Sequence, residues 1–296
     1  MALCNICPRK CNIDRSRTPG YCKLGENPTA AAAFLHMWEE PCISGSRGSG
    51  TVFFSGCNLR CVFCQNSDIS QLNKGKEITP ARLREIYFEL IDGGAHNINL
   101  VTPTHFLGAV IKSLEKPLPV PVVYNCGGYE SVESLRRLEG KIQIYMPDLK
   151  YLSSAIALRY SSAQDYPQIA TAAIAEMYRQ TGDYILEETH DISEPLMKSG
   201  VIIRHLVLPS NIDNTLDVID YFAENYADGK ALFSLMSQYY PRYRAAEFPE
   251  INRTLTNEEY ERVESYLRYS PINDGYIQGT DSADEKYIPI FDCRGI

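Results

Sequence analysis

Runs of apolar residues alternate with amphipathic segments through the middle of the chain. Short runs rich in β-branched and aromatic residues predict strands, and apolar residues at helical spacing predict the helices between them. We expect strands at 51–56, 97–101, 120–125, 142–150, 201–209 and 231–237, and helices at 80–92, about 104–115, 131–140, about 153–180 and 215–226. This alternation predicts an α/β fold with about six β/α units, fewer than the eight of a closed barrel.

Two of the expected helices begin with specific capping signals. Thr79 stands at the N-cap before Pro80, and Gly93 follows the last apolar residues of the same segment, as expected for the two ends of a helix. Beyond the sixth strand, Thr256 and Glu259 form a capping box, so another helix begins there.

The loop after the first expected strand reads SGCNLRCVFCQN and places Cys57, Cys61 and Cys64 within eight residues. Structural zinc sites usually take four ligands in two pairs, whereas three thiolates can bind three irons of a [4Fe–4S] cube and leave the fourth iron open. Active sites of parallel α/β barrels lie at the carboxyl ends of the strands. The spacing therefore favours an open cluster at this strand end over three buried apolar cysteines.

A second group of thiols lies in the stretch CNICPRKCNIDRSRTPGYC, at Cys4, Cys7, Cys11 and Cys22. Four thiols suffice for a closed site, which is either structural zinc or a second iron–sulfur cluster, and Cys42 is a substitute ligand. Spacing alone does not separate zinc from iron. A cluster would suit electron delivery to the first site, whereas zinc would stabilise a segment too short to fold alone.

Composition and charge narrow the classes of function. The 296 residues are 44% apolar and 22% charged, with a formal net charge of -8, so no basic surface is expected for nucleic acid. The longest apolar run is too short to cross a bilayer, and MALCNICPRK does not resemble a signal peptide. We therefore expect a cytoplasmic protein without membrane or nucleic-acid partners. Its ten cysteines, eight of them in the first 64 residues, are then expected as metal ligands rather than disulfides.

The sequence CNLRCVFC resembles the Cys-x3-Cys-x2-Cys signature of the radical S-adenosylmethionine (SAM) superfamily, and Phe63 matches the aromatic residue before its last cysteine. The resemblance implies that Cys57, Cys61 and Cys64 hold a [4Fe–4S] cluster whose open iron binds the amino and carboxylate groups of SAM. One electron from such a cluster cleaves SAM to methionine and a 5'-deoxyadenosyl radical. A partial (β/α)6 barrel of the TIM type is also implied.

Over about 50–208 the chain resembles the glycyl-radical-enzyme activating branch of that superfamily, and within it chains described as pyruvate formate-lyase activating proteins of unassigned substrate. That branch carries a Gly-Gly-Glu motif after the second strand, which contacts the SAM amino group. Here the position reads Val101-Thr102-Pro103-Thr104-His105, without a carboxylate. The two threonines, backbone carbonyls and His105 could accept hydrogen bonds from the ammonium. Alternatively, Thr102 and Thr104 are strand-end and capping residues.

The next two strand ends read YNCGG and MPDLK. By resemblance, Asn125, Cys126, Met146 and Asp148 would assemble a monovalent-cation site beside the SAM carboxylate. The structural alternative is a local ion pair between Asp148 and Lys150.

On the fifth strand, Arg204 corresponds to an arginine that faces the SAM carboxylate in related enzymes, and an inward arginine needs a charged partner. Its neighbour His205 is expected to be structural. Gln238 follows the sixth strand and is a further expected polar contact. The complete set of residues expected to contact SAM is Phe63, Thr102, Thr104, Asn125, Asp148, Lys150, Arg204 and Gln238.

The segment after the sixth strand resembles the C-terminal region of the same group of activating proteins and is rich in tyrosine and arginine. Tyr239, Tyr240, Arg242 and Tyr243 either line the open side of the barrel or pack beneath a long loop. We expect three parts, namely a Cys-rich segment at 1–47, the partial barrel at 48–240 and a helical extension covering it at 241–296.

The sequence thus predicts a radical SAM oxidoreductase that cleaves SAM for hydrogen abstraction and accepts electrons from a flavodoxin- or ferredoxin-type reductant. The resemblance implies a glycyl radical enzyme of the pyruvate formate-lyase type as partner. A rival hypothesis is an enzyme that modifies a small molecule or peptide. A hypothesis from another class is a non-enzymatic iron–sulfur electron carrier, which would not bind SAM.

Overall fold

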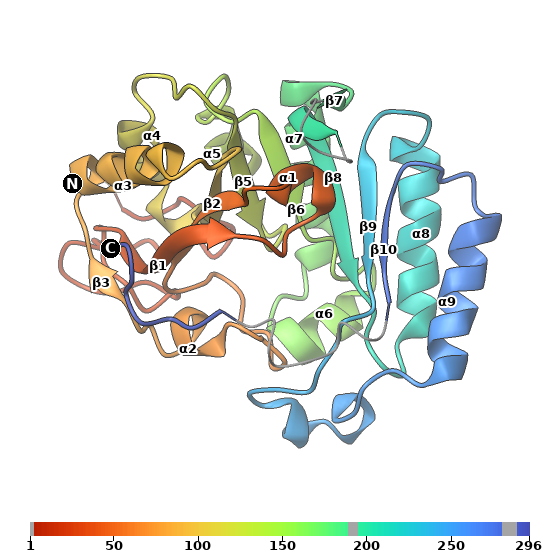
Figure 1. Ribbon diagram of the computed structural model, residues 1–296. Helices are drawn as coiled ribbons and strands as arrows, with labels where there is room; N and C mark the ends of the chain where they lie inside the picture. The colour runs from red at the N-terminus through yellow and green to blue at the C-terminus, as the bar shows by residue number, and fades with distance from the viewer. Residues whose placement is uncertain (1–2, 189–194, 280–288) are drawn as a thin grey trace.

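The computed structural model describes residues 3–188, 195–279 and 289–296. One large sheet forms its centre, with the strand order β10-β9-β8-β6-β5-β4-β2-β1-β3 (Figure 1). The parallel strands are β2 (Ser49–Phe54), β4 (Ile98–Val101), β5 (Val122–Cys126), β6 (Ile144–Pro147), β8 (Leu196–Leu206), β9 (Leu232–Met236) and β10 (Gly275–Gln278). The antiparallel strands are β1 (Thr29–His36) beside β2, β3 (Lys76–Glu77) beside β1, and β7 (Ile185–Glu187) beside β8.

All six expected strands are present, and the sheet is an open partial barrel as predicted. Within the described ranges, no pairing joins β10 to β3. The sheet extends beyond the predicted barrel limits of 48 and 240, because β1 precedes the first limit and β10 follows the second. Neither β1 nor β10 was predicted from the sequence. The division into 1–47, 48–240 and 241–296 therefore cuts across one continuous sheet.

Helices cover the outer face of this sheet (Figure 1). They are α3 (Pro80–Asp92), α4 (Leu107–Ser113) after the 3-10 turn η1 (Thr104–Phe106), α5 (Val132–Arg136), α6 (Ser154–Ser161), α7 (Tyr166–Thr181) and α8 (Ile212–Tyr226). The helix α9 (Asn257–Tyr269) packs outside α8. Short elements lie in the loops, at α1 (Pro41–Ser44), α2 (Ser67–Ser70), η2 (Ala245–Glu247) and η3 (Pro249–Ile251).

The capping signals are confirmed, and one expected helix is divided. The Thr79 hydroxyl accepts from the backbone N–H of Arg82 at 3.1 Å, and both hydrogen bonds of the Thr256–Glu259 capping box are present. The segment expected as helix from about 153 to 180 forms α6 and α7 instead, because Ser162 takes a left-handed conformation with φ of 53° after α6. Pro167 lies in the first turn of α7, where a missing N–H is tolerated.

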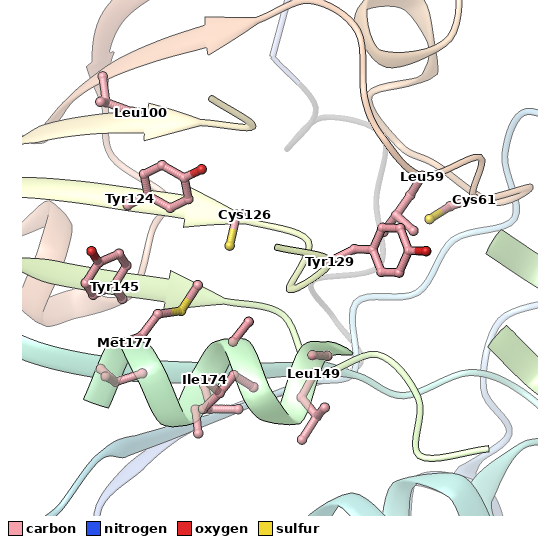
Figure 2. Close-up of a cluster of buried hydrophobic side chains, with 14 of the residues drawn as sticks. Leu59, Cys61, Leu100, Tyr124, Cys126, Tyr129, Tyr145, Leu149, Ile174 and Met177 are labelled. Carbon is pink, nitrogen blue, oxygen red and sulfur yellow. The ribbon is translucent and has the colours of Figure 1, made fainter. Parts of the chain in front are cut away.

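The main hydrophobic core lies between the sheet and the outer helices. Figure 2 shows Tyr124 and Tyr145 on neighbouring strands, with Ile174 and Met177 of α7 packed against the sheet. All four side chains are buried. Burying a large apolar side chain contributes about 1.5–3 kcal/mol before the entropy cost of ordering it. The outer face of each strand is therefore held by the helices, which leaves the inner face and the strand ends for chemistry.

A second, smaller core lies inside the barrel, and α1 is part of it. Cys42 and Ile43 of α1 pack against the inward-facing residues Val123, Ile144, Met146, Met197, Ile202 and Leu232. Several of these residues stand near the amino ends of their strands, so α1 fills the lower part of the interior. The structure also places Cys42 in this core and not with the amino-terminal thiols, for which it was a predicted substitute ligand.

The C-terminal segment 289–296 returns to β1. The backbone N–H of Ala33 donates to the carbonyl of Arg294 at 2.9 Å, and the N–H of Cys293 donates to Ala31 at 2.9 Å. None of the helices in the described part of the chain has the length and apolar character needed to cross a lipid bilayer.

Candidate active site

The cysteine loop begins directly after β2, through a glycine that the packing requires. Gly56 has a φ of +79°, and a Cβ there would stand 2.9 Å from the ring of His105 and 3.0 Å from the carbonyl oxygen of Cys22. Only glycine fits such a conformation at so close an approach. The turn directs Cys57 away from β2 and over the carboxyl ends of the parallel strands.

Each of the three expected cluster ligands has a hydrogen-bonding neighbour at its sulfur. The N–H of Leu59 donates to Cys57 Sγ at 3.3 Å, and the Ser161 hydroxyl donates to Cys61 Sγ at 3.0 Å. Ser70 Oγ and Cys64 Sγ are 3.2 Å apart. Such contacts stabilise thiolates and tune iron–sulfur clusters. The donor set therefore fits a cluster held by three cysteines.

Burial keeps the free thiols of Cys57 and Cys64 neutral. It raises the pKa of Cys57 well above its ordinary value and that of Cys64 to about 11, and the neighbouring Cys61 adds to both shifts. In the described ranges no three Cys, His, Asp or Glu side chains stand as the ligands of a single ion.

The three cysteines open onto a cavity of about 690 Å³, within the range of small-molecule sites. Figure 2 shows Cys61 and Leu59 beyond the carboxyl ends of β5 and β6, with Cys126 at the end of β5. The residues expected to contact SAM that line this cavity are Phe63, Thr102, Asn125, Asp148, Lys150, Arg204 and Gln238. The structure therefore brings together seven side chains from distant parts of the chain.

Thr104 and His105 lie outside this cavity, contrary to their expected role. The Thr104 hydroxyl donates to the buried carboxylate of Glu130 at 2.5 Å. His105 is buried, with Nε2 2.7 Å from the carbonyl oxygen of Ser55. Both residues belong to the 3-10 turn η1, which rotates them away from the strand end. They contact the residues next to the cysteine loop and β5 on the side away from the cavity.

Thr102, directly after β4, is held in an unusual conformation. Its φ is +59°, which is a true outlier for a β-branched residue. Its backbone N–H donates to the carbonyl of Asn125 at 2.8 Å. The residue therefore presents its side chain at the cavity wall at some cost in backbone strain.

A buried charge network links the ends of three strands, β5, β6 and β8. Arg204 donates to Asp148 at 3.0 Å and to the amide oxygen of Asn125 at 2.7 Å, and Lys150 donates to Asp148 at 2.6 Å. Burial would raise the pKa of Asp148, but the charges of Lys150 and Arg204 outweigh it and hold the pKa below its ordinary value. The predicted partner of Arg204 and the predicted Asp148–Lys150 ion pair are thus both present.

The same network argues against the expected monovalent-cation site. The guanidinium of Arg204 lies between Asn125 and Asp148, where the resemblance placed the cation. Met146 packs into the interior core instead of lining the cavity. A resident positive charge therefore already occupies this position.

Glu39 and Glu40 are cavity residues that the sequence analysis missed. They lie in the turn between β1 and α1. Glu39 accepts from Asn99 at 2.9 Å and pairs with Arg204 at 3.4 Å. Burial raises the pKa of both carboxyls, although Arg204 opposes the shift. The sequence feature that could have identified them is a pair of adjacent acidic residues before Pro41, inside an otherwise apolar stretch.

His205 is structural, as expected, and within the tyrosine-rich segment Tyr239 packs in the core whereas Tyr240 and Tyr243 are exposed. The two ring nitrogens of His205 contact the carbonyl of Leu149 and the hydroxyl of Thr215. Tyr239 is buried, donates to the carbonyl of Ile251 at 2.7 Å, and packs edge-on against Phe63 with ring centroids 5.7 Å apart. The other three predicted residues, Tyr240, Arg242 and Tyr243, are not among the residues that line the cavity.

The amino-terminal thiols lie against the back of the cysteine loop. An ideal Cβ on Gly20 would stand 3.6 Å from the sulfurs of both Cys11 and Cys22, so these two thiols face each other across Gly20. The N–H of Tyr21 donates to Cys11 Sγ at 3.3 Å. Burial raises the pKa of Cys7 to about 12, and the nearby thiols of Cys11 and Cys4 add to the shift. The four thiols are therefore close enough to influence one another.

Arginine side chains attach this segment to the cluster loop. Arg9 donates to the carbonyl oxygens of Asn58 at 2.8 Å and Ser162 at 2.7 Å. The ring of Tyr21 lies between the guanidinium groups of Arg9 and Arg60, at 4.1 and 4.0 Å. Arg60 is itself one of the residues between Cys57 and Cys61. The two groups of cysteines are thus parts of one packed unit.

Comparison with known proteins agrees with this geometry. A sequence profile of the radical SAM superfamily matches residues 51–157, which include the three cysteines and the first strand ends. An uncharacterised protein of Methanocaldococcus jannaschii is 33% identical over 271 residues, which cover 88% of this chain and 72% of that protein. Most of the chain thus has a counterpart in that relative.

Two solved structures of Streptococcus suis SuiB share the fold. The SAM-bound structure superimposes with a TM-score of 0.50 at 14% identity, over 75% of this chain and 48% of SuiB. A second SuiB structure gives a TM-score of 0.50 at 14% identity, over 78% of this chain and 48% of SuiB. This chain therefore matches about half the length of SuiB, and the likeness concerns the fold alone. The profile match and the similarity to the archaeal relative show that the chain belongs to the radical SAM superfamily, whose cofactors are a [4Fe–4S] cluster and SAM.

Proposed function

We propose that this enzyme cleaves SAM reductively and abstracts a hydrogen atom from a substrate bound in the same cavity. The observation that carries the proposal is the set of three hydrogen-bonded thiols, Cys57, Cys61 and Cys64, facing polar strand ends across one cavity. When bound, the cluster and SAM together supply a 5'-deoxyadenosyl radical for one electron, and that radical takes a hydrogen atom from a C–H bond. The products are methionine, 5'-deoxyadenosine and a substrate radical.

The residues of the chain bind and orient SAM. Arg204 and Lys150 carry the positive charges that face a carboxylate, and Asp148 holds both in place through its two oxygens. Phe63 provides an apolar wall beside the third cysteine, and its contact with Tyr239 fixes the ring. Thr102 and Gln238 add hydrogen-bonding groups on opposite sides of the cavity wall.

The finer identity of the substrate has two candidates. The MPDLK strand end and the YNCGG turn resemble the activating branch, which supports a glycine of a pyruvate formate-lyase type protein as hydrogen donor. The buried carboxylates of Glu39 and Glu40 at the cavity wall instead favour a small molecule or peptide with a positive charge.

The amino-terminal thiols are proposed to bind a second iron–sulfur cluster. The thiols of Cys11 and Cys22 lie beside Gly20, and Cys4 and Cys11 are close enough to Cys7 and Cys22 to act on both. The carbonyl of Cys22 lies against Gly56, immediately before Cys57. A cluster held by Cys4, Cys7, Cys11 and Cys22 would lie between the molecular surface and the radical site. Electrons from a flavodoxin- or ferredoxin-type reductant would then have a route through the segment that Arg9 and Tyr21 attach to the cluster loop.

The test of the proposed function is anaerobic. Reconstituted and reduced protein is incubated with SAM, and 5'-deoxyadenosine is measured with and without a candidate glycyl radical enzyme. We expect deoxyadenosine from the wild type and none from Cys57→Ala, Cys61→Ala or Cys64→Ala. Cys293→Ala is the matched control, because Cys293 lies in the C-terminal segment beside β1 and should leave the reaction unchanged. Cleavage retained by any of the three loop variants would refute the assignment, and a glycyl radical on the added partner would identify the activating role.

A further inference from the structure

The interior of the barrel contains a polar layer directly above the α1 core. Side chains two positions apart on a strand face the same side of a sheet, so Asn125 follows Val123 into the interior and Arg204 follows Ile202. Ser234 follows Leu232 in the same way and pairs in register with Arg204. Such barrels are normally filled with branched apolar side chains. A polar layer here therefore needs an explanation.

Glu39 and Glu40 project into this layer from the turn between β1 and α1. Glu40 is 2% exposed, and its Oε2 has no hydrogen-bonding partner in the described part of the chain. Asn99 Oδ1 and Gln278 Oε1 are two more buried acceptors without a partner there. Glu40 and Gln278 line the cavity itself, and Asn99 is attached to it through Glu39. Ser234, in the same layer, offers one hydroxyl donor to the Glu40 carboxyl, and one hydroxyl proton cannot serve all of these acceptors. Because buried polar atoms are rarely left unpaired in native proteins, the remaining acceptors are available to an N–H donor.

The charges around this group do not balance. Three carboxylates, those of Glu39, Glu40 and Asp148, share the cavity wall with two cations, Arg204 and Lys150. Lys150 is bound to Asp148, and Arg204 contacts Asp148 and Glu39 and also faces the Glu40 carboxyl without a direct contact. Glu40 is thus left without an ion-pair contact among the described residues. A buried unpaired carboxylate is costly, and a ligand cation would remove that cost.

We propose that Glu40, with Asn99, Gln278 and Glu39, binds an ammonium or guanidinium group of the substrate. This proposal deepens the proposed function and rests on it, because the occupant is the molecule from which hydrogen is taken. Glu39, Glu40 and Gln278 line the cavity with acceptor oxygens, of which Glu40 Oε2 and Gln278 Oε1 have no partner among the described residues, and acceptors of this kind suit the N–H donors of an ammonium. They are too few for Ca²⁺ or Mg²⁺, which take six or more oxygen ligands. The substrate class is therefore an amine, or a peptide that presents a lysine or arginine side chain.

The position of the group also separates it from the SAM site. Arg204 and Asp148 stand between Glu39 and the Lys150 side of the cavity, and the cysteines belong to the loop that follows β2. The proposed cation-binding residues Glu39 and Glu40 belong to the β1–α1 turn, and Gln278 belongs to β10. A substrate cation held there would lie inside the barrel, with the rest of the substrate extending towards the strand ends.

The test uses the reconstituted holoenzyme with SAM and three probes: N-acetyl-lysine amide, N-acetyl-arginine amide and the uncharged N-acetyl-norleucine amide. Binding is measured by calorimetry. We expect one or both charged probes to bind and the norleucine probe to bind about tenfold more weakly or not at all. Glu40→Gln should weaken the charged probe about tenfold while leaving the affinity for SAM unchanged. Glu130→Gln is the matched control, since Glu130 is equally buried but lies outside the cavity.

Several results would overturn the proposal. Equal binding of the charged and norleucine probes by the wild type would do so even if Glu40→Gln failed to fold. Loss of SAM affinity in Glu40→Gln would assign the group to the ammonium of SAM, and stabilisation by K⁺ or Na⁺ in place of the probes would assign it to an inorganic ion. Production of deoxyadenosine by the wild type without any probe tests SAM cleavage alone. The proposed SAM cleavage and the proposed cation site can therefore fail independently of each other.

Discussion

At the scale of single residues, the cluster ligands were the most predictable feature of the site. Cys57, Cys61 and Cys64 are predicted as ligands from their spacing, from Phe63 and from the strand before them, because all of these features lie in one short stretch of the chain. Their hydrogen-bonding neighbours were not predictable. Ser161 lies 100 residues from Cys61 along the sequence and reaches it only because α6 ends beside the loop.

The hydrogen bond from Ser161 should influence the reduction potential of the cluster. A hydrogen bond to a ligand sulfur stabilises the more negative, reduced form. Ser161→Ala is therefore expected to make the midpoint potential more negative, as measured by redox titration with electron paramagnetic resonance (EPR) detection. Ser162→Ala, the adjacent residue without a hydrogen bond to sulfur among the described contacts, is the control. An unchanged potential in Ser161→Ala would show that this contact does not act on the cluster.

The strained Thr102 permits a test that separates stability from binding. Replacing it by glycine removes a β-branched side chain from a φ of +59°, which should raise the free energy of unfolding by about 1 kcal/mol. The same change should weaken SAM binding if the hydroxyl contacts the cofactor. Thr104→Ala should instead lower the free energy of unfolding and leave SAM binding unchanged, because Thr104 bonds to Glu130 outside the cavity. Thermal melts and SAM titration of both variants distinguish these outcomes.

At the scale of elements, segments with a recognisable apolar pattern were predicted well, whereas short segments and the alanine-rich β1, which has no alternation of apolar and polar residues, were not. The helices α3 and α9 follow from their caps and apolar spacing, and each parallel strand of the central barrel follows from an apolar run. The strands β1 and β10 and the helix α1 were missed. The four residues of β10 have no period to detect and are ordered by β9, while α1 is a single turn held by the barrel interior. Glu39 and Glu40 were not predicted as cavity residues because they directly precede α1, whose position depends on the barrel interior.

The amino-terminal segment gives a prediction at this scale. If Cys4, Cys7, Cys11 and Cys22 bind a second cluster, the reconstituted wild type should contain about eight irons per chain, since each cube holds four. Cys22→Ala should lose about four of them and keep the EPR signal of the SAM-binding cluster. About four irons together with one zinc in the wild type would instead assign a structural zinc site. Cys293→Ala should retain the wild-type content.

At the scale of the whole molecule, the carboxyl of Glu130 is buried outside the cavity. Burial raises the pKa of Glu130 to about 7, against the opposing hydrogen bonds from Thr104 and Tyr124. A carboxyl whose pKa is higher in the folded than in the unfolded state stabilises the fold at low pH. That contribution is complete below about pH 4.5 and is lost as the pH rises towards 7.

Glu130→Gln should therefore flatten the pH dependence of stability. Between pH 5 and pH 8 the wild type should lose on the order of 3 kcal/mol through Glu130, and the variant, which cannot ionise there, should not. Urea unfolding of both proteins at the two pH values measures the difference. A parallel loss in wild type and variant would contradict the assigned pKa.

The central claim is that the three loop cysteines hold a cluster to which SAM binds directly. The most direct measurement is the EPR spectrum of the reduced, reconstituted protein before and after the addition of SAM, with ¹⁷O-labelled SAM carboxylate to report coupling to the iron. We predict a change of spectrum and an ¹⁷O coupling in the wild type and in Cys22→Ala. An unchanged spectrum without ¹⁷O coupling, from a fully loaded cluster, would contradict the account and favour an iron–sulfur electron carrier.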